Sequence, residues 1–175
     1  MHRVKRRGST KSAQCRRSIK KIAFFTILIL LCNICAFAQD EQGEKKAAVG
    51  LGAEFNMNSR YNFAGGAVLG FDFNLSRALA AGFTVTYSSN FSGISVIEPA
   101  ALFRWYIFGG GAGLFVQADA GAYLVLEDGE LTPLFMGGLR GGFRLPLGEL
   151  FFIEPYGRGG YPFVFGVGVI AGTRF

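Results

Sequence analysis

From Ala47 to the last residue, apolar positions alternate with small or polar positions. The final stretch, residues 163–175, shows the pattern most plainly. One alternate set is apolar except at Thr173, and it consists of Phe163, Phe165, Val167, Val169, Ala171, Thr173 and Phe175. The other set is mostly small residues and ends with Arg174. A period of two is typical of a β-strand, so this stretch is predicted to be a strand with one apolar face.

Seven earlier stretches show the same alternation, and turn residues separate them. The eight predicted strands are residues 47–57, 63–75, 78–88, 94–108, 112–124, 133–145, 151–161 and 163–175. No stretch shows helical periodicity, and strands of about 9–11 tilted residues are long enough to cross a bilayer. Pro99 and Pro155 fall inside two of these strands, and proline within a strand is typical of a bulge. We therefore expect bulges at both prolines.

Charged residues fall on only one face of the predicted strands. The apolar faces carry no charge, and the opposite faces carry Glu54, Asp72, Glu98, Asp119, Glu154, Arg104, Arg140, Arg144, Arg158 and Arg174. A soluble sandwich would place its charges outside and its apolar residues inside. This arrangement is the reverse, and it predicts an apolar outer surface in contact with lipid. A sheet in lipid must close on itself. We therefore predict an all-β fold, an eight-stranded antiparallel up-and-down transmembrane β-barrel over residues 47–175.

The five inward acids and five inward arginines predict how the barrel interior is filled. A charge buried in a narrow barrel is costly unless it is paired. We therefore expect a network of Arg–Asp and Arg–Glu salt bridges through the lumen, with Arg174 near Asp72 or Glu154. Glycines are frequent on the same inward faces, and we expect them to leave room for the long arginine side chains.

The first 38 residues differ from the rest of the chain. They hold nine of the 18 Lys and Arg residues and no Asp or Glu. A basic segment precedes the apolar residues 22–31, and Ala36-Phe37-Ala38 follows as a cleavage site. This order predicts a cleaved secretory signal peptide over residues 1–38. The alternative, a transmembrane anchor, needs about 20 apolar residues, more than are present. Residues 39–46 read as a flexible polar lead-in.

Once the leader is set aside, the charge and the cysteine content add little to this interpretation. The remainder has nine basic and 12 acidic residues, so its net charge is 9 − 12 = −3, and the formal charge of +6 gives no reason to expect nucleic acid as a partner. Cys15, Cys32 and Cys35 all lie in the leader. Neither cysteine near the cleavage site follows a small residue, which disfavours a lipoprotein. The mature chain then has no disulfide and no thiol chemistry.

On these grounds the chain resembles small bacterial outer-membrane β-barrel proteins such as the OmpA membrane domain, OmpX and OmpW. The most specific part of the resemblance is the C-terminal strand, with Val167, Val169, Ala171 and Thr173 at alternate positions before the terminal Phe175. In that family such a strand is the signal read by the outer-membrane assembly machinery. The resemblance implies residence in the cell outer membrane, with membrane lipid and that machinery as partners.

Candidate chemistry is sparse. His2 is the only histidine and lies in the leader, so a Ser-His or Cys-His mechanism is excluded and we expect no enzymatic activity. Glu54 and Asp119 could form an acid–base pair, but ion pairing is the simpler interpretation. The similar segments Ile97-Glu98-Pro99 and Ile153-Glu154-Pro155 could form a ligand or gating pair, or could each supply a carboxylate to a nearby arginine. No metal or cofactor is expected.

Three classes of function remain. The first is a structural or interaction barrel whose lumen is filled by the salt-bridge network. The alternative is a narrow channel or conduit for small or hydrophobic molecules, as in OmpW-like proteins, with a small-molecule solute as a possible partner. A surface adhesin ranks third, because the predicted turns are short.

Overall fold

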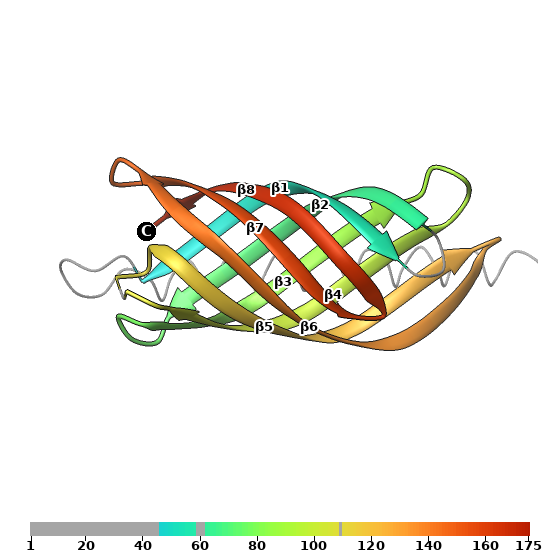
Figure 1. Ribbon diagram of the computed structural model, residues 1–175, viewed down its shortest axis with the longest axis horizontal. Helices are drawn as coiled ribbons and strands as arrows, with labels where there is room; N and C mark the ends of the chain where they lie inside the picture. Colours follow the sequence, from blue (N-terminus) through green and yellow to red (C-terminus); the bar gives the residue numbers. More distant parts are fainter. Residues whose placement is uncertain (1–45, 59–61, 109) are drawn as a thin grey trace, which may run out of the picture. The chain divides into compact units, whose positions relative to one another are not determined.

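The computed structural model describes residues 46–58, 62–108 and 110–175. The expected signal peptide and all of the lead-in except Lys46 lie outside these residues. In the described part of the chain, eight antiparallel strands close a barrel in sequence order, as the alternation predicted (Figure 1). The strands are β1 (Ala47–Asn58), β2 (Asn62–Asn74), β3 (Leu79–Ser89), β4 (Ser95–Tyr106), β5 (Gly113–Glu127), β6 (Glu130–Leu147), β7 (Phe151–Tyr161) and β8 (Phe163–Arg174). None of the described residues forms a helix long and apolar enough to cross a membrane.

The seam between the first and last strands closes the barrel. β1 pairs with β2 on one side and with β8 on the other. Ala47 and Phe175 exchange two backbone hydrogen bonds of 2.9 Å, so pairing continues to the last residue of the chain. We call the end of the barrel that contains Ala47 and Phe175 the terminal rim, and the opposite end the distal rim.

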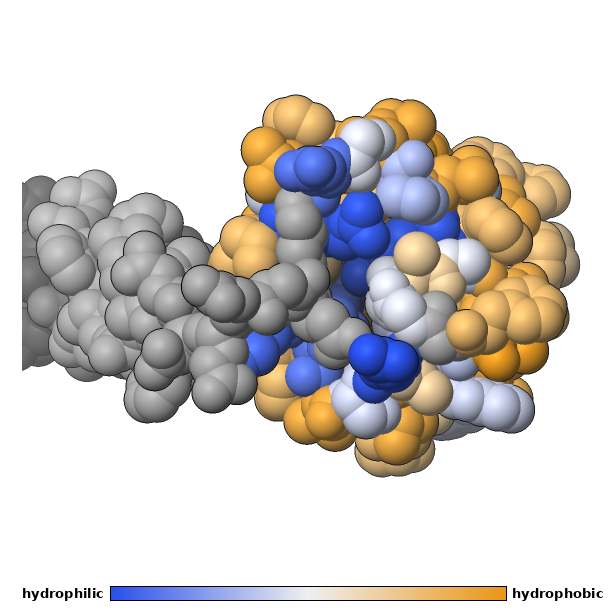
Figure 2. Space-filling model, turned by 90° about the vertical axis from the view of Figure 1, so that its left-hand side faces the viewer, coloured by the Kyte–Doolittle hydropathy of each residue, from blue (hydrophilic) through white to orange (hydrophobic). Residues whose placement is uncertain are grey.

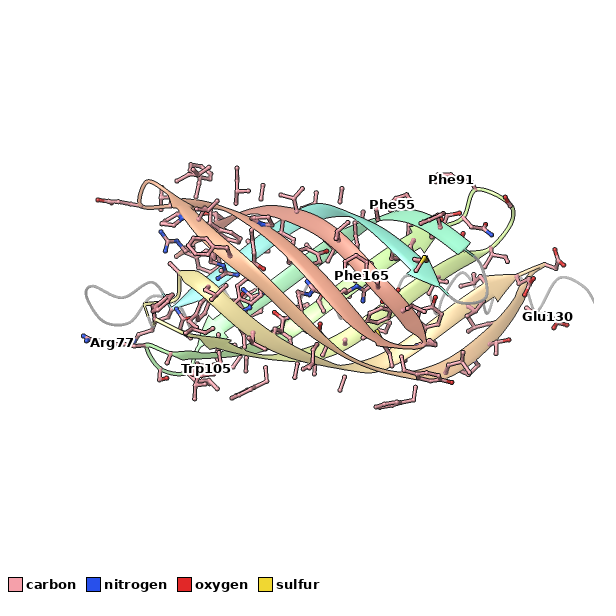
Figure 3. All side chains as sticks on the ribbon, viewed as in Figure 1. Phe55, Arg77, Phe91, Trp105, Glu130 and Phe165 are labelled. Carbon is pink, nitrogen blue, oxygen red and sulfur yellow. The ribbon has the colours of Figure 1, made fainter. Side chains whose placement is uncertain are left out.

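The outer surface of the barrel is apolar, and its charged strand residues face inward. Along each strand, large apolar side chains are exposed at alternate positions, and the intervening positions are mostly buried. Phe55, Trp105 and Phe165 point away from the barrel and are each about half exposed (Figure 3). Viewed along the barrel from one end, hydrophobic residues form the outer surface, and hydrophilic residues lie inside the ring that they form (Figure 2).

The bulges predicted at Pro99 and Pro155 are wrong. The pairs that flank each proline keep one register: Ile97↔Leu124 and Ala100↔Gly121 around Pro99, and Gly142↔Tyr156 and Leu145↔Ile153 around Pro155. No residue is inserted at either place. Proline lacks the amide N–H that would face the neighbouring strand, so pairing is interrupted on that side while the register is kept.

A bulge occurs instead where β8 begins. Met57 pairs with Phe165 and Asn58 with Phe163, so Val164 is the extra residue. The extra residue reverses the alternation: Val164 and Phe165 are 50% and 51% exposed, and Phe163 is 2% exposed. The prediction that Phe163 belongs to the outer face is therefore wrong, because its side chain points into the barrel.

β5 and β6 form a longer hairpin than predicted, and it extends beyond the neighbouring strands at the distal rim (Figure 1). We expected residues 125–132 to form a loop, but pairing continues to Glu127↔Glu130. Asp128 and Gly129 alone make the turn, with φ of 48° and 83°. Two central residues with positive φ suit a two-residue hairpin, and Asp-Gly is a favoured sequence there.

The β6 side of this hairpin has an open edge. Among the described residues, β7 joins β6 only from the pair Gly137↔Tyr161 onward. Because Glu127 and Glu130 close a two-residue hairpin, the backbone groups of residues 130 and 132 face β5, and those of residues 131, 133 and 135 face the open edge. Pro133 therefore places its missing N–H on that edge.

Candidate functional site

The barrel interior contains nine of the ten charged residues that the sequence placed there. Strand alternation turns them inward from β1, β2, β4, β5, β6 and β7, and each is 5% exposed or less. They are Glu54, Asp72, Glu98, Arg104, Asp119, Arg140, Arg144, Glu154 and Arg158. Five carboxylates thus face four guanidinium groups in a space almost closed to solvent.

Four of these residues form a cluster that we call the neutral quartet: Asp72, Arg104, Arg144 and Glu154. Arg104 donates to both Glu154 oxygens at 2.9 Å and lies 3.4 Å from Asp72 Oδ2. Arg144 donates from Nη2 to Asp72 and from Nε to Glu154, both at 2.7 Å. Each acid contacts both arginines, so two charges of each sign cancel locally. Such forked contacts suit the planar guanidinium group.

The other five residues form an acidic group of Glu54, Glu98, Asp119, Arg140 and Arg158. Arg158 bridges two strands by donating from Nε to Glu54 at 3.0 Å and from Nη1 to Glu98 at 2.7 Å. Arg140 lies less closely against Asp119, with Nε 3.5 Å from Oδ2. Three carboxylates against two guanidinium groups leave this part of the lumen with one excess negative charge.

Gln117 on β5 joins the two clusters. Its Oε1 accepts from Arg104 Nε at 2.8 Å and from Nη2 at 2.6 Å, and its Nε2 donates to Asp119 Oδ1 at 2.6 Å. Gln117 was not predicted to belong to the network, because it is uncharged. A signal was present, since Gln117 shares the inward face of its strand with Asp119 and pairs with Arg104 across the sheet.

Each interior arginine also stacks on an aromatic ring, which the sequence analysis did not foresee. The distances from guanidinium carbon to ring centre are 4.2 Å for Arg104–Phe115, 4.4 Å for Arg140–Tyr156, 4.3 Å for Arg144–Phe152 and 4.0 Å for Arg158–Phe163. A cation over a ring face is stabilised, more strongly when water is excluded. Phe163 supplies one of these four rings, because the bulge in β8 turns its side chain inward.

Several of the inward glycines make room for these rings. A Cβ added at Gly142 would lie 2.7 Å from Phe115 Cζ, and one at Gly172 would lie 2.5 Å from Phe152 Cζ. The expectation that glycines leave room for arginines is met at Gly166, where a Cβ would lie 3.3 Å from Arg158 Cγ. Making room for arginines therefore accounts for only part of the inward glycine pattern, since other glycines lie against aromatic rings or, as at Gly66 and Gly82, against the backbone of the neighbouring strand.

Buried apolar clusters lie on either side of the charges. One reaches the terminal rim and contains Ala48, Val68, Ala80, Tyr106, Phe115, Phe152, Tyr156 and Ile170. The other lies toward the distal rim and contains Val96, Ala100, Tyr123, Val125, Met136 and Phe163. Buried apolar side chains therefore pack around the charged residues inside the barrel.

Arg174 stands apart from the network. Its Nη2 donates to the carbonyl oxygen of Gly148, in the β6–β7 turn, at 3.4 Å. The expected contact with Asp72 or Glu154 is not formed, because Arg104 and Arg144 hold both carboxylates in the neutral quartet. Arg174 ends β8 at the terminal rim, where solvent is within reach.

The predicted assembly signal lies on the outer face of β8. Val167, Val169 and Ala171 are exposed, and Thr173 and Phe175 are half-buried at the terminal rim. This face belongs to the apolar wall of the barrel. The chain therefore presents these side chains outward, away from the charged interior.

The carboxylates considered for acid–base or ligand roles already bind neighbouring side chains. Glu54 accepts from Tyr156 and Arg158, and Asp119 accepts from Gln117, so each proposed acid–base carboxylate is already engaged. Glu98 and Glu154, which precede the two prolines, likewise bind arginines. No group of three His, Cys, Asp or Glu residues within residues 46–58, 62–108 and 110–175 is placed to hold a metal ion.

Comparisons with known proteins identify similar folds and nothing more specific. No family profile matches the sequence, and no curated protein sequence matches it. Among solved structures, the N-terminal β-barrel domain of Pseudomonas aeruginosa OprF is similar, with 15% identity, 77% of this chain and 100% of that chain covered, and a TM-score of 0.56. Neisserial surface protein A is similar with 14% identity, coverage of 73% and 94%, and a TM-score of 0.51. At such identities the likeness concerns the closed eight-stranded barrel.

Proposed function

We propose that this chain is an integral outer-membrane β-barrel protein with a closed interior and a structural or interaction role, without enzymatic activity. The observation that carries the proposal is the inverted polarity of the barrel: exposed apolar side chains outside and paired charges inside. Only lipid can cover such a wall on all sides, and only a closed sheet satisfies its backbone there. A signal peptide over residues 1–38 would bring the chain to that membrane.

The filled lumen favours this role over a conduit. The two charge clusters are joined by Gln117, and apolar side chains pack on both sides of them. A solute would have to separate guanidinium groups from carboxylates in a space with little water, and breaking such buried pairs is costly. The small-solute conduit is therefore the alternative that experiment must exclude.

Conductance measurements test this choice. We expect purified protein in planar lipid bilayers to give no stable open steps, because the charge clusters block the lumen. Heat-dependent mobility of the same sample on gels would establish that the barrel is folded. Stable open steps from such a sample would contradict the closed interior and favour the conduit.

Assembly supplies a second test. Deletion of Phe175 is expected to reduce strongly the amount of folded protein in the outer membrane, because this residue completes the β1–β8 seam and ends the proposed assembly signal. Membrane fractionation with heat-modifiable gel mobility measures the loss. Arg174→Ala is the control and should insert normally, since Arg174 lies outside the network. Normal insertion of the deletion variant would refute the role proposed for Phe175.

A further inference from the structure

A small cavity lies beside the neutral quartet, in the middle of the lumen. Its volume is about 10 Å³, and its lining includes Thr84, Arg140, Asp72, Glu154 and Gly70. A site of about 10–15 Å³ holds one water molecule if it offers two to four polar partners. The cavity therefore has the size of a single water.

Two of the lining side chains have polar atoms left over. Within the described part of the chain, Thr84 Oγ1 and Arg140 Nη2 are buried and have no hydrogen-bond partner. Thr84 is 3% exposed and Arg140 is 2% exposed. Leaving a buried donor or acceptor unsatisfied costs about 1–3 kcal/mol, so two such atoms on one cavity require an explanation.

We propose that one structural water molecule binds in this cavity, accepting a hydrogen bond from Arg140 Nη2 and joining it to the Thr84 hydroxyl. Asp72 and Glu154 also line the cavity, and a carboxylate of either can accept a hydrogen bond from the water. The water thereby connects the neutral quartet with Arg140, the arginine held least closely by its carboxylate.

The charges that line the cavity limit its occupant. Two carboxylates and three guanidinium groups line it, so an anion is the competing occupant that the bromide soak described below must exclude. Arg104, Arg140 and Arg144 all line the cavity, which disfavours a cation. Genuinely dry cavities are lined by apolar side chains. This lining combines the apolar Leu102, Phe152 and Ile170 with one threonine, two acidic residues and three arginines.

Thr84→Val tests the proposal, because valine keeps the shape of threonine and removes the hydroxyl. If water is bound, the variant loses one of its partners, and the unfolding equilibrium constant should rise about tenfold in urea titrations of the folded protein. If the cavity is dry, the change removes an unsatisfied hydroxyl, and the constant should fall. Thr132→Val, an exposed change in β6, gives the baseline for the substitution.

A crystal structure of the unmodified protein decides the matter if Thr84→Val does not fold. One water peak within hydrogen-bond distance of Thr84 Oγ1 and Arg140 Nη2 is expected. A cavity without density, at a resolution that shows other buried waters, would overturn the proposal. An anomalous peak in the cavity after a bromide soak would overturn it in favour of an anion.

Discussion

Arg158→Met is expected to lower the free energy of unfolding by about 3–5 kcal/mol. Arg158 is the arginine that holds Glu54 and Glu98 together, and it stacks on Phe163. Its removal leaves two buried carboxylates without their cation in the group that already has an excess negative charge. Urea or heat unfolding of the protein refolded in detergent or lipid measures the loss.

Two companion variants separate the ion pairs from the packing. Arg174→Met removes an arginine outside the network and should change stability by less than about 0.5 kcal/mol. Adding Glu54→Gln and Glu98→Gln to Arg158→Met removes the uncompensated charges, so part of the lost stability should return. If Arg158→Met were as stable as the unmodified protein, the buried network would not hold the barrel together.

Gly142→Ala is expected to destabilise the barrel by about 1–3 kcal/mol, because the new methyl group overpacks the interior. It would lie 2.7 Å from both Phe115 Cζ and the carbonyl oxygen of Pro155, and 2.8 Å from Tyr156 Cβ. The backbone oxygen cannot move without disturbing β7. The two rings support Arg104 and Arg140, so the strain would also reach the charge clusters. Unfolding in urea measures the effect.

The adjacent residue supplies the control. Gly141 is on the outer face, and a Cβ there would meet nothing within 4 Å. Gly141→Ala should therefore be neutral or stabilise by about 0.4–1 kcal/mol through the unfolded chain. Equal effects of the two substitutions would show that the interior tolerates extra volume and that the inward glycines are not needed for packing.

The barrel could be predicted from the sequence because its main determinant is local. Alternation along each strand sets which side chains face out, and eight alternating stretches in succession leave few other closed folds. The inward phase of charges such as Glu98 and Glu154 was predicted correctly even beside a proline, since each strand keeps its register there.

The features that could not be predicted depend on contacts between strands that are far apart in the sequence. The alternation within one strand does not show which residue of the neighbouring strand lies opposite. The extra residue in β8 and the inward position of Phe163 were therefore not predicted. Partner choice follows from barrel geometry: Arg104 lies within reach of Glu154, 50 residues away in the chain. Gln117 and the four stacked rings were missed because charge and glycine content, from which the interior was predicted, do not identify them.

Pro133 on the open edge of β6 has a consequence for contacts between copies of the barrel. An exposed strand edge invites pairing with another copy, which leads to aggregation. On this edge Leu131 and Phe135 keep their amide groups, while Pro133 between them has none to donate. A strand added here would lack its middle hydrogen bond. The hairpin of β5 and β6 can therefore extend beyond the neighbouring strands at the distal rim and still be a poor template for amyloid-like stacking.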